Sequence, residues 1–408
     1  MGVPSPRSLA LDLLLRWQDS DVFIDQLLAD ADRRQTLSPP DRALLHALVL
    51  GVLRHGNLLD LWIDRLRQGK LRDSPRWILR LGLFQLMHMG LPEHAAVNES
   101  VRLARHEKGL INAILRSAIR EKTTLQAVEE SAPDDIRYSL PEFLCDRWRR
   151  RFGEEAFRRL AALTQEPAAV FVRVNRLKPP PANAPGEPVP DAPDFFRVEH
   201  LPRAGLAAGT VYGQDPATAV APMLLAPTPG SRVLDACAAP GGKTAILAQA
   251  MDNRGPLLAT DVQPSRLERL RGNLARLGVT CADVESIDWT QPRPVDDPRR
   301  FDFILLDVPC SNTGVLQRRV DVRWRLTEDD IPRMAALQWK IVENTVPCLA
   351  PGGRLVYSTC SLEPEENEAQ AARIAATFPH LRRMETREIL PHETGWDGAF
   401  AAAFEHVG

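Results

Sequence analysis

The chain has 408 residues, more than one hydrophobic core usually organises, so two or three domains are expected. Its 51 basic and 53 acidic residues give a net charge of −2, which neither indicates nor excludes a nucleic-acid partner. Six cysteines without CxxC pairs argue against a disulfide scaffold or a metal site. No apolar run is long enough for a membrane span or a secretory signal, so we expect a cytoplasmic protein without a membrane partner.

The first third of the chain is predicted to be helical. Between residues 5 and 125 apolar residues recur at helical spacing, with almost none of the alternation typical of strands. Ser-Pro pairs at 38–39 and 74–75 have the residue types that favour helix starts. We therefore predict an all-α bundle over residues 1–130.

The next segment, residues 131–212, is predicted to be a small α+β accessory domain. It contains a basic stretch at 146–159 and, from 170 to 178, an alternating segment typical of a strand with one polar face. Residues 179–193 are rich in proline, which lacks an amide donor and fixes the backbone, so an exposed spacer is expected there.

From residue 213 to 408 short apolar runs alternate with helical stretches. This pattern predicts a Rossmann-like parallel sheet with helices on both faces and a ligand site at the carboxyl ends of its strands. The runs that we read as buried strands are SRVLDAC, PLLATDV, FDFILLDVPC and GRLVYSTC.

A small-residue turn follows the first of these strands, in VLDACAAPGGKT (233–244), and leads into a helix. Small residues let the backbone approach a ligand, and the helix start offers free amides. A Walker A loop is disfavoured, because its first glycine would have to stand where the chain has Cys237. The turn therefore does not favour a nucleoside triphosphatase, and the Asp261 that ends the second strand favours a nucleoside-bearing ligand.

Four aspartates stand at successive strand ends and would line a negative crevice suited to a sulfonium cation. Asp261 is expected to bind ribose hydroxyls and Asp288 to meet an adenine edge, although any single aspartate could instead cap a helix. The four are Asp235, Asp261, Asp288 and Asp307.

Two cysteines also fall at strand ends, Cys310 in DVPCSNTG and Cys360 in YSTCSLEPEENE. Free cysteines are commonly buried and inert. Carbon 5 of cytosine, however, accepts a methyl group only after a thiolate adds at carbon 6. That addition also needs the N3 side of the ring to be polarised, a role suited to Asp307. These residues do not by themselves decide which cysteine attacks.

The motifs DACAAPGGKT, DVPCSNTG and YSTCSLEPEEN resemble the three signatures of the Sun-type RNA 5-methylcytosine methyltransferases. Segments 41–60, 92–105 and 111–116 resemble the NusB-like helical RNA-binding domain that the bacterial RsmB (Fmu) branch carries in front. The resemblance spans almost the whole chain.

The resemblance implies an rRNA (cytosine-C5)-methyltransferase that uses S-adenosylmethionine. It implies that Cys360 is the nucleophile, that Cys310 serves product release and that Asp307 acts on the N3 side of the cytosine. It further implies, with Arg266 as a weaker candidate, that the cofactor is bound by Cys237, Ala238, Ala239, Pro240, Gly241, Gly242, Lys243, Asp261, Asp288 and Asp307.

Three positions depart from the family pattern: Asn312 replaces the usual Gly, Val308 the usual Ala, and 397–404 is looser than the usual ending. The expected substrate is 16S rRNA or an early small-subunit intermediate, bound by a monomer. The alternatives are the same chemistry on tRNA or another RNA, and a noncatalytic RNA-binding or antitermination factor.

A target cytosine must be unpaired or extruded from its helix, which is easiest in a loop. We expect a phosphate-contacting surface formed by Arg149, Arg151, Arg173 and Asn175, with a solvated helix face as the alternative for this basic region.

Overall fold

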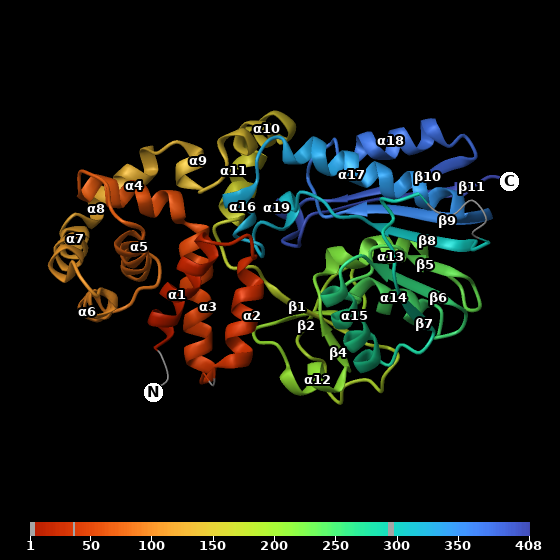
Figure 1. Ribbon diagram of the computed structural model, residues 1–408, viewed down its shortest axis with the longest axis horizontal. Coiled ribbons are helices and arrows are strands. Elements are labelled where there is room, and N and C mark those ends of the chain that lie inside the picture. Colours follow the sequence, from red (N-terminus) through yellow and green to blue (C-terminus); the bar gives the residue numbers. More distant parts are fainter. Residues whose placement is uncertain (1–4, 36, 293–297) are drawn as a thin grey trace. The chain divides into compact units, whose positions relative to one another are not determined.

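The structure is a computed structural model that describes residues 5–35, 37–292 and 298–408. These divide into two compact units, which Figure 1 draws as ribbons. The helical unit comprises residues 1–167 and 316–326, and the sheet unit comprises 168–315 and 327–408. The predicted boundaries after residues 130 and 212 differ from this division. The helices between residues 131 and 167 join the helical unit, and residues 168–212 join the sheet unit.

The helical unit is built around buried side chains of the apolar pattern, such as Leu48 and Val52. Ser38 caps the third helix as predicted, accepting a hydrogen bond from the amide of Asp41, whereas the fifth helix begins at Asp73, ahead of Ser74. Its helices are α1 (Pro6–Gln18), α2 (Ile24–Arg34), α3 (Pro39–Arg54), α4 (Gly56–Leu66), α5 (Asp73–Met87), α6 (Glu93–Leu103), α7 (Lys108–Arg120), α8 (Lys122–Ser131), α9 (Asp134–Arg137), α10 (Glu142–Phe152), α11 (Glu154–Leu163) and α16 (Val322–Arg325).

Within the described ranges, no single helix is long and apolar enough to cross a membrane. The pair α3 and α4 passes that test together, on length and composition only, and is bent by 76°.

Residues 316–326 belong to the helical unit although they follow the sheet unit's Cys310 along the chain. Figure 1 shows α16 of this segment, in cyan, beside α11. The Trp324 ring packs edge-on against Trp17, and its Nε1 donates to the Leu53 carbonyl at 2.7 Å. Arg323 is buried and donates from its guanidinium to the carbonyl oxygens of Arg54, Tyr138, Thr164 and Leu316, at 3.0 to 3.3 Å.

Arg323→Met should destabilise the helical unit by about 3 kcal/mol, because four carbonyl groups, three of them in buried hydrogen bonds, lose a charged donor. Burial lowers the pKa of Arg323 to about 9, so the guanidinium is still charged at neutral pH. Native-state hydrogen exchange of α3 and α4 measures the effect and should accelerate about 100-fold. Arg319→Met, at an exposed position of the same segment, should change exchange little. Equal exchange in both variants would contradict the role given to Arg323.

The sheet unit begins with a small antiparallel sheet of order β2-β3-β1-β4. The proline-rich segment is not a spacer throughout, since Glu187 and Pro188 pair with Arg197 and Phe196. Pro188 is tolerated because β2 lies at the edge of the sheet, where its missing amide breaks no ladder. The elements are β1 (Val170–Val174), β2 (Glu187–Pro188), β3 (Phe195–Val198), α12 (Arg203–Ala208) and β4 (Val211–Gly213).

The larger sheet has the order β10-β11-β9-β8-β5-β6-β7. The strands from β5 to β9 pair in parallel, and β11 is antiparallel to both of its neighbours. Its strands are β5 (Val233–Asp235), β6 (Leu257–Asp261), β7 (Ala282–Ser286), β8 (Phe301–Asp307), β9 (Leu349–Thr359), β10 (Leu381–Ile389) and β11 (Ala399–His406).

Helices cover both faces of this sheet, each over its own apolar cluster, as predicted for a Rossmann-like fold. The face with α14 and α15 buries Leu247 and Leu270, and the face with α17 and α18 buries Trp339 and Ile374. The remaining elements are η1 (Pro216–Ala219), α13 (Val220–Leu225), α14 (Gly242–Ala250), α15 (Pro264–Leu277), η2 (Thr313–Val315), α17 (Asp330–Thr345), η3 (Val346–Cys348), α18 (Glu368–Thr377) and α19 (Pro391–Thr394).

The strand order reverses at β5, which pairs with β6 on one side and β8 on the other. A parallel sheet binds ligands at such a point, beyond the carboxyl ends of its strands. There β5 ends at Asp235, β8 ends at Asp307, and β9 ends one residue before Cys360. The fold therefore brings the predicted site residues to one edge of the sheet.

Candidate active site

The turn after β5 requires small residues. Gly241 has a φ of 104°, a region that side chains rarely adopt, and a Cβ there would lie 2.8 Å from Leu270. A Cβ on Gly242 would come within 3.0 Å of both Tyr212 and Gln214. The glycines thus leave a backbone cradle at the start of α14, where the predicted strand, turn and helix follow one another.

The aspartates that end β5 and β6 are buried beside this turn. Asp235 accepts a hydrogen bond from the Thr244 hydroxyl through Oδ2 at 2.7 Å, while its buried Oδ1 has no partner in the described parts of the chain. Burial raises the pKa of Asp235 to about 7. Asp261 forms an ion pair of 3.2 Å with Arg266, which also donates to the Ala239 carbonyl.

Asp288 behaves differently from the other aspartates. It is exposed and accepts from the amide and the hydroxyl of Thr290, at 2.9 and 2.6 Å. These hydrogen bonds lower the pKa of Asp288. The carboxylate is therefore charged and engaged in a local turn, and no helix begins at this described position for it to cap. Its contact with an adenine edge stays a proposal.

The residues present fit a nucleoside sulfonium. The cradle at Gly241 and Gly242 admits a close ligand, the unpartnered Oδ1 of Asp235 offers a hydrogen-bonding atom, and the buried Asp261 supplies negative potential. When bound, S-adenosylmethionine supplies an electrophilic methyl group at this edge of the sheet.

The two cysteines meet at the same edge, with their Sγ atoms 3.1 Å apart. Cys310 is buried and Cys360 is partly exposed. The hydrogen bond to Cys360, burial, and the negative charges at Cys360 and Glu366 all raise the pKa of Cys310. In the pair, the proton therefore stays on Cys310.

Asn312, one of the departures from the family pattern, belongs to this cysteine pair. Its φ of 61° is left-handed, which explains why glycine suits the position and asparagine is tolerated. Its Nδ2 donates to the Cys310 carbonyl at 2.9 Å, and its Oδ1 lies 3.4 Å from the Cys360 Sγ. Val308, the second departure, is buried in the sheet core.

Lys243 lies on Asp307, with 2.7 Å between Nζ and Oδ2. Burial opposes the charge of the lysine, but the Asp307 carboxylate outweighs it and raises the pKa of Lys243. The Ser358 hydroxyl donates to the other oxygen of Asp307 at 3.3 Å. The sequence pattern placed Lys243 in the cofactor loop but did not predict its contact with Asp307. A signal for that contact exists, because Lys243 follows β5, Asp307 ends β8, and these two strands are neighbours in a fold of this kind.

The predicted RNA-contacting residues fall in both units, and two of them are wrong. Arg173 is buried and donates to Gln214 and Gln249, and Asn175 is buried and donates to the carbonyls of Gly209 and Leu277. Their alternating pattern indicated a polar strand face, but that face packs inside the sheet unit.

The basic stretch at 146–159 in the helical unit is also less available for phosphate contacts than its sequence indicates. Arg149 pairs with three carboxylates, those of Asp134, Asp146 and Glu154, at 2.6 to 2.9 Å. Arg151 is partly exposed, with its guanidinium over the ring of Phe152 at 5.1 Å.

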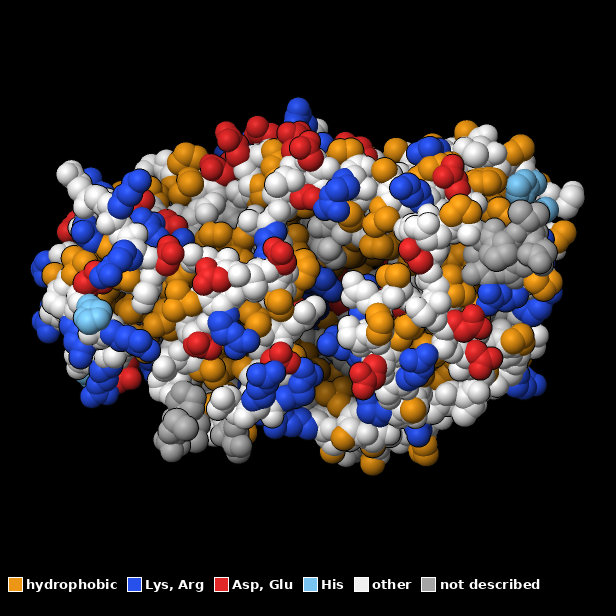
Figure 2. Space-filling view, in the orientation of Figure 1, with side chains coloured by type: hydrophobic (Ala, Val, Ile, Leu, Met, Phe, Trp, Pro, Cys, Tyr) orange, Lys and Arg blue, Asp and Glu red, His pale blue; other side chains and the backbone are white. Residues whose placement is uncertain are grey.

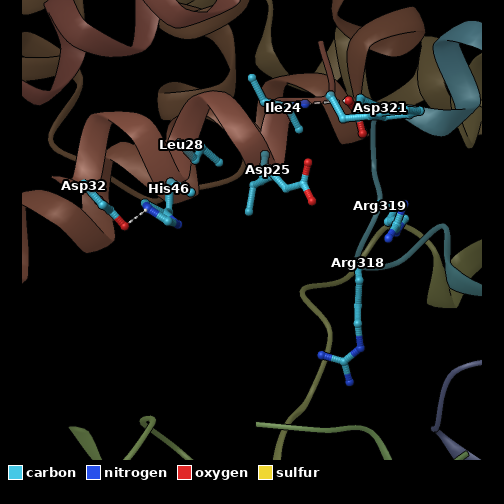
Figure 3. Close-up of a pocket in the computed structure, with 11 residues that line it drawn as sticks. Ile24, Asp25, Leu28, Asp32, His46, Arg318, Arg319 and Asp321 are labelled. Atoms are coloured by element: carbon cyan, nitrogen blue, oxygen red, sulfur yellow. Dashed lines mark hydrogen bonds and ion pairs between the residues drawn. The ribbon is translucent and has the colours of Figure 1, made fainter. Parts of the chain in front are cut away.

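The helical unit also contains a cavity of about 240 Å³, shown in Figure 3. Arg318 and Arg319 approach it from the 316–326 segment, and Asp25 and the hydrogen-bonded pair Asp32 and His46 approach it from α2 and α3. Three carboxylates and two arginines line it, so it has no excess of positive charge that would favour a phosphate group. Its lining consists of Phe23, Ile24, Asp25, Leu28, Ala29, Asp32, His46, Leu50, Arg318, Arg319 and Asp321.

Comparison with known proteins decides the family. Residues 222–405 match the family described as 16S rRNA methyltransferase RsmB/F, and residues 4–120 match the NusB family. The ribosomal RNA small subunit methyltransferase B of Salmonella arizonae is 36% identical over 399 residues, covering 90% of this chain and 91% of that protein. The chain belongs to the RsmB/F methyltransferase family. Family membership confirms the predicted enzyme class, cofactor and NusB-like domain.

Solved structures share the architecture of this RsmB/F family member. The structure of PH0851 covers 99% of both chains with a TM-score of 0.78 at 22% identity, a likeness of fold. A methyltransferase homolog protein from Pyrococcus horikoshii is 30% identical, with a TM-score of 0.58, over 67% of this chain and 98% of its own.

Proposed function

We propose that this RsmB/F family member methylates carbon 5 of a cytosine in 16S rRNA through a covalent bond between Cys360 and carbon 6. The observation that carries the proposal is the pair of thiols 3.1 Å apart, at the sheet edge that also holds the cofactor cradle and the Lys243–Asp307 pair. A noncatalytic RNA-binding factor would not need this combination.

The reaction begins when the Cys360 thiolate adds to carbon 6, which moves the electron pair of the C5–C6 double bond toward carbon 5 and the N3 side of the ring. The Asp307 carboxylate, paired with Lys243, is assigned to accept a hydrogen bond from that side of the cytosine, from the N4 amino group or from a protonated N3. Carbon 5 then takes the methyl group. Once the Cys360 sulfur is bonded to carbon 6, its hydrogen bond and negative charge no longer raise the pKa of Cys310, so that thiol can release its proton to solvent. We assign to the Cys310 thiolate the removal of the carbon 5 proton, which restores the double bond and expels the Cys360 thiolate.

The environments of the two thiols support this order of roles. The more exposed Cys360 is accessible to a cytosine that enters the crevice. Cys310 is buried, and its raised pKa keeps that thiol protonated in the free enzyme. A thiolate rather than a thiol is the nucleophile, so the attacking group should be Cys360.

Asp307→Asn should slow single-turnover methyl transfer by about 10²- to 10³-fold, because the N3 side of the ring loses its charged partner and Lys243 loses its ion pair. Rapid-quench measurement of methyl transfer gives the rate, and calorimetry of S-adenosylmethionine binding separates this role from a contact with the cofactor. Asp302→Asn, which removes a carboxylate from the same strand where it pairs with Arg232, is the control. An unchanged rate in Asp307→Asn would overturn the assignment.

We further propose that the enzyme acts as a cytoplasmic monomer on naked 16S rRNA or an early small-subunit intermediate, at a cytosine in a loop. Lys and Arg side chains are spread over the helical unit among Asp and Glu on the face in Figure 2. On this face the mixture favours distributed phosphate contacts over one basic patch. Arg151 remains a proposed contact, and Arg149 a weaker one because three carboxylates already pair with it.

Methyl incorporation into deproteinised 16S rRNA, assembled small subunits and tRNA tests the substrate. We expect incorporation into deproteinised 16S rRNA and little into tRNA. Incorporation only into assembled subunits would contradict the proposed stage, and incorporation only into tRNA would favour the alternative substrate.

A further inference from the structure

Each of the two cysteines is followed by a serine, and both serines bind one carboxylate. The hydroxyls of Ser311 and Ser361 both donate to Oε1 of Glu366, the latter at 2.7 Å. The Ser311 amide donates to Oε2 at 2.9 Å. Glu366 therefore connects the loop after β8, which carries Cys310, with the loop after β9, which carries Cys360.

Residues outside the two loops, on α17 and β9, also bind Glu366. Gln338 of α17 donates to Oε2 at 2.7 Å, and the Tyr357 hydroxyl lies 2.6 Å from the main-chain oxygen of Glu366. Glu366 is fully buried, and Ser311 and Ser361 are 5% and 1% exposed. A buried carboxylate that loses a donor is strongly destabilised, so this set of contacts resists displacement.

We propose that Glu366 is a positioning residue that sets the separation of Cys360 and Cys310 through Ser361 and Ser311. The inference rests on the roles proposed above for the two cysteines. Because Glu366 is fully buried behind the two loops, it acts by fixing them and not by contact with the base or the cofactor. A displacement of a reacting group by about 1 Å can lower the rate about 100-fold, so loops that hold the two thiols in place contribute directly to the rate.

The carboxylate has a second effect, through its charge. Its negative charge contributes to the raised pKa of Cys310 and so helps to keep that thiol protonated. Removing the charge should lower the pKa of Cys310 and move the pH profile of product release toward lower pH. A residue that merely filled space would leave this profile where it is.

The test compares Glu366→Gln with Glu368→Gln, which removes the same charge at an exposed position two residues on. Glu366→Gln should slow single-turnover methyl transfer by about 30- to 100-fold, shift the release profile to lower pH and leave S-adenosylmethionine affinity unchanged. Glu368→Gln should do none of these. A rate and a pH profile equal to wild type in Glu366→Gln would overturn the proposal.

Should Glu366→Gln fail to fold, the serines provide the test. Ser311→Ala and Ser361→Ala act through one carboxylate, so the loss in the double variant should fall well short of the product of the single losses. Fully multiplicative losses would show independent roles and contradict the proposal.

Covalent RNA adducts of Cys310→Ala separate this inference from the proposed function. No adduct in Cys310→Ala with Glu366 intact would mean that the cysteine roles themselves are wrong. Adduct that forms equally fast in Cys310→Ala and in Cys310→Ala combined with Glu366→Gln would overturn the positioning role alone. Slower adduct formation in the combined variant is the expected result.

Discussion

Cys360→Ala is expected to abolish methyl transfer, with a loss of at least about 10⁴-fold, as is typical when a covalent nucleophile is removed. Without the thiolate, carbon 5 of cytosine is too weakly nucleophilic to take the methyl group. Incorporation of labelled methyl into 16S rRNA measures the loss. Binding of S-adenosylmethionine should persist, because the cradle at Gly241 and the buried Asp235 are untouched.

Cys281→Ala is the matched control for this experiment, since Cys281 is also partly exposed but lies beside β7, away from the thiol pair. It should retain wild-type activity. If Cys360→Ala kept more than a few per cent of the wild-type rate, the covalent route through this residue would be excluded.

Cys310→Ala is expected to trap the enzyme on its RNA. Cys360 can still add to carbon 6 and the methyl group can still transfer, but the step that removes the carbon 5 proton and frees Cys360 is impaired. A complex of protein and RNA that survives denaturing electrophoresis should accumulate, and turnover should fall to roughly a single event per enzyme.

Peptide mapping of the trapped complex identifies the attached residue. The account requires the RNA to be linked to the peptide that contains Cys360. Should the complex accumulate instead in Cys360→Ala, with RNA linked to Cys310, the two roles would be reversed.

Much of this site could be predicted because the fold converts sequence order into position. Buried parallel strands are visible as apolar runs, and their carboxyl ends share one edge of the sheet. Asp235, Asp261, Asp307 and Cys360 end or directly follow such runs, so their convergence follows from the strand assignment alone. The order of the two cysteines came from family resemblance, and the structure adds a physical reason in the burial of Cys310.

Contacts between distant segments could not be predicted from local pattern. Lys243 and Asp307 are 64 positions apart, and Ser311 and Glu366 are 55 apart. Neither pair shares an element, so periodicity contains no signal for it. The placement of Arg323 in the helical unit is of the same kind, because its partners are main-chain carbonyls that any residue offers.

The RNA-contacting prediction shows a different limit. An arginine on an alternating strand has the same sequence signature whether it faces solvent or is satisfied in the interior. Arg173 is 2% exposed because Gln214 and Gln249 supply oxygens for its guanidinium. These hydrogen-bond partners come from other elements that pack against the strand. The alternation of residue types along one strand contains no information about them.

The central claim is tested most directly by mass spectrometry of the nucleosides from deproteinised, unmodified 16S rRNA incubated with the purified enzyme and S-adenosylmethionine. The account predicts new 5-methylcytidine with the wild-type enzyme and none with Cys360→Ala. A methyl group found on another atom of cytidine or on another nucleoside, or no methylation although the cofactor binds, would contradict it.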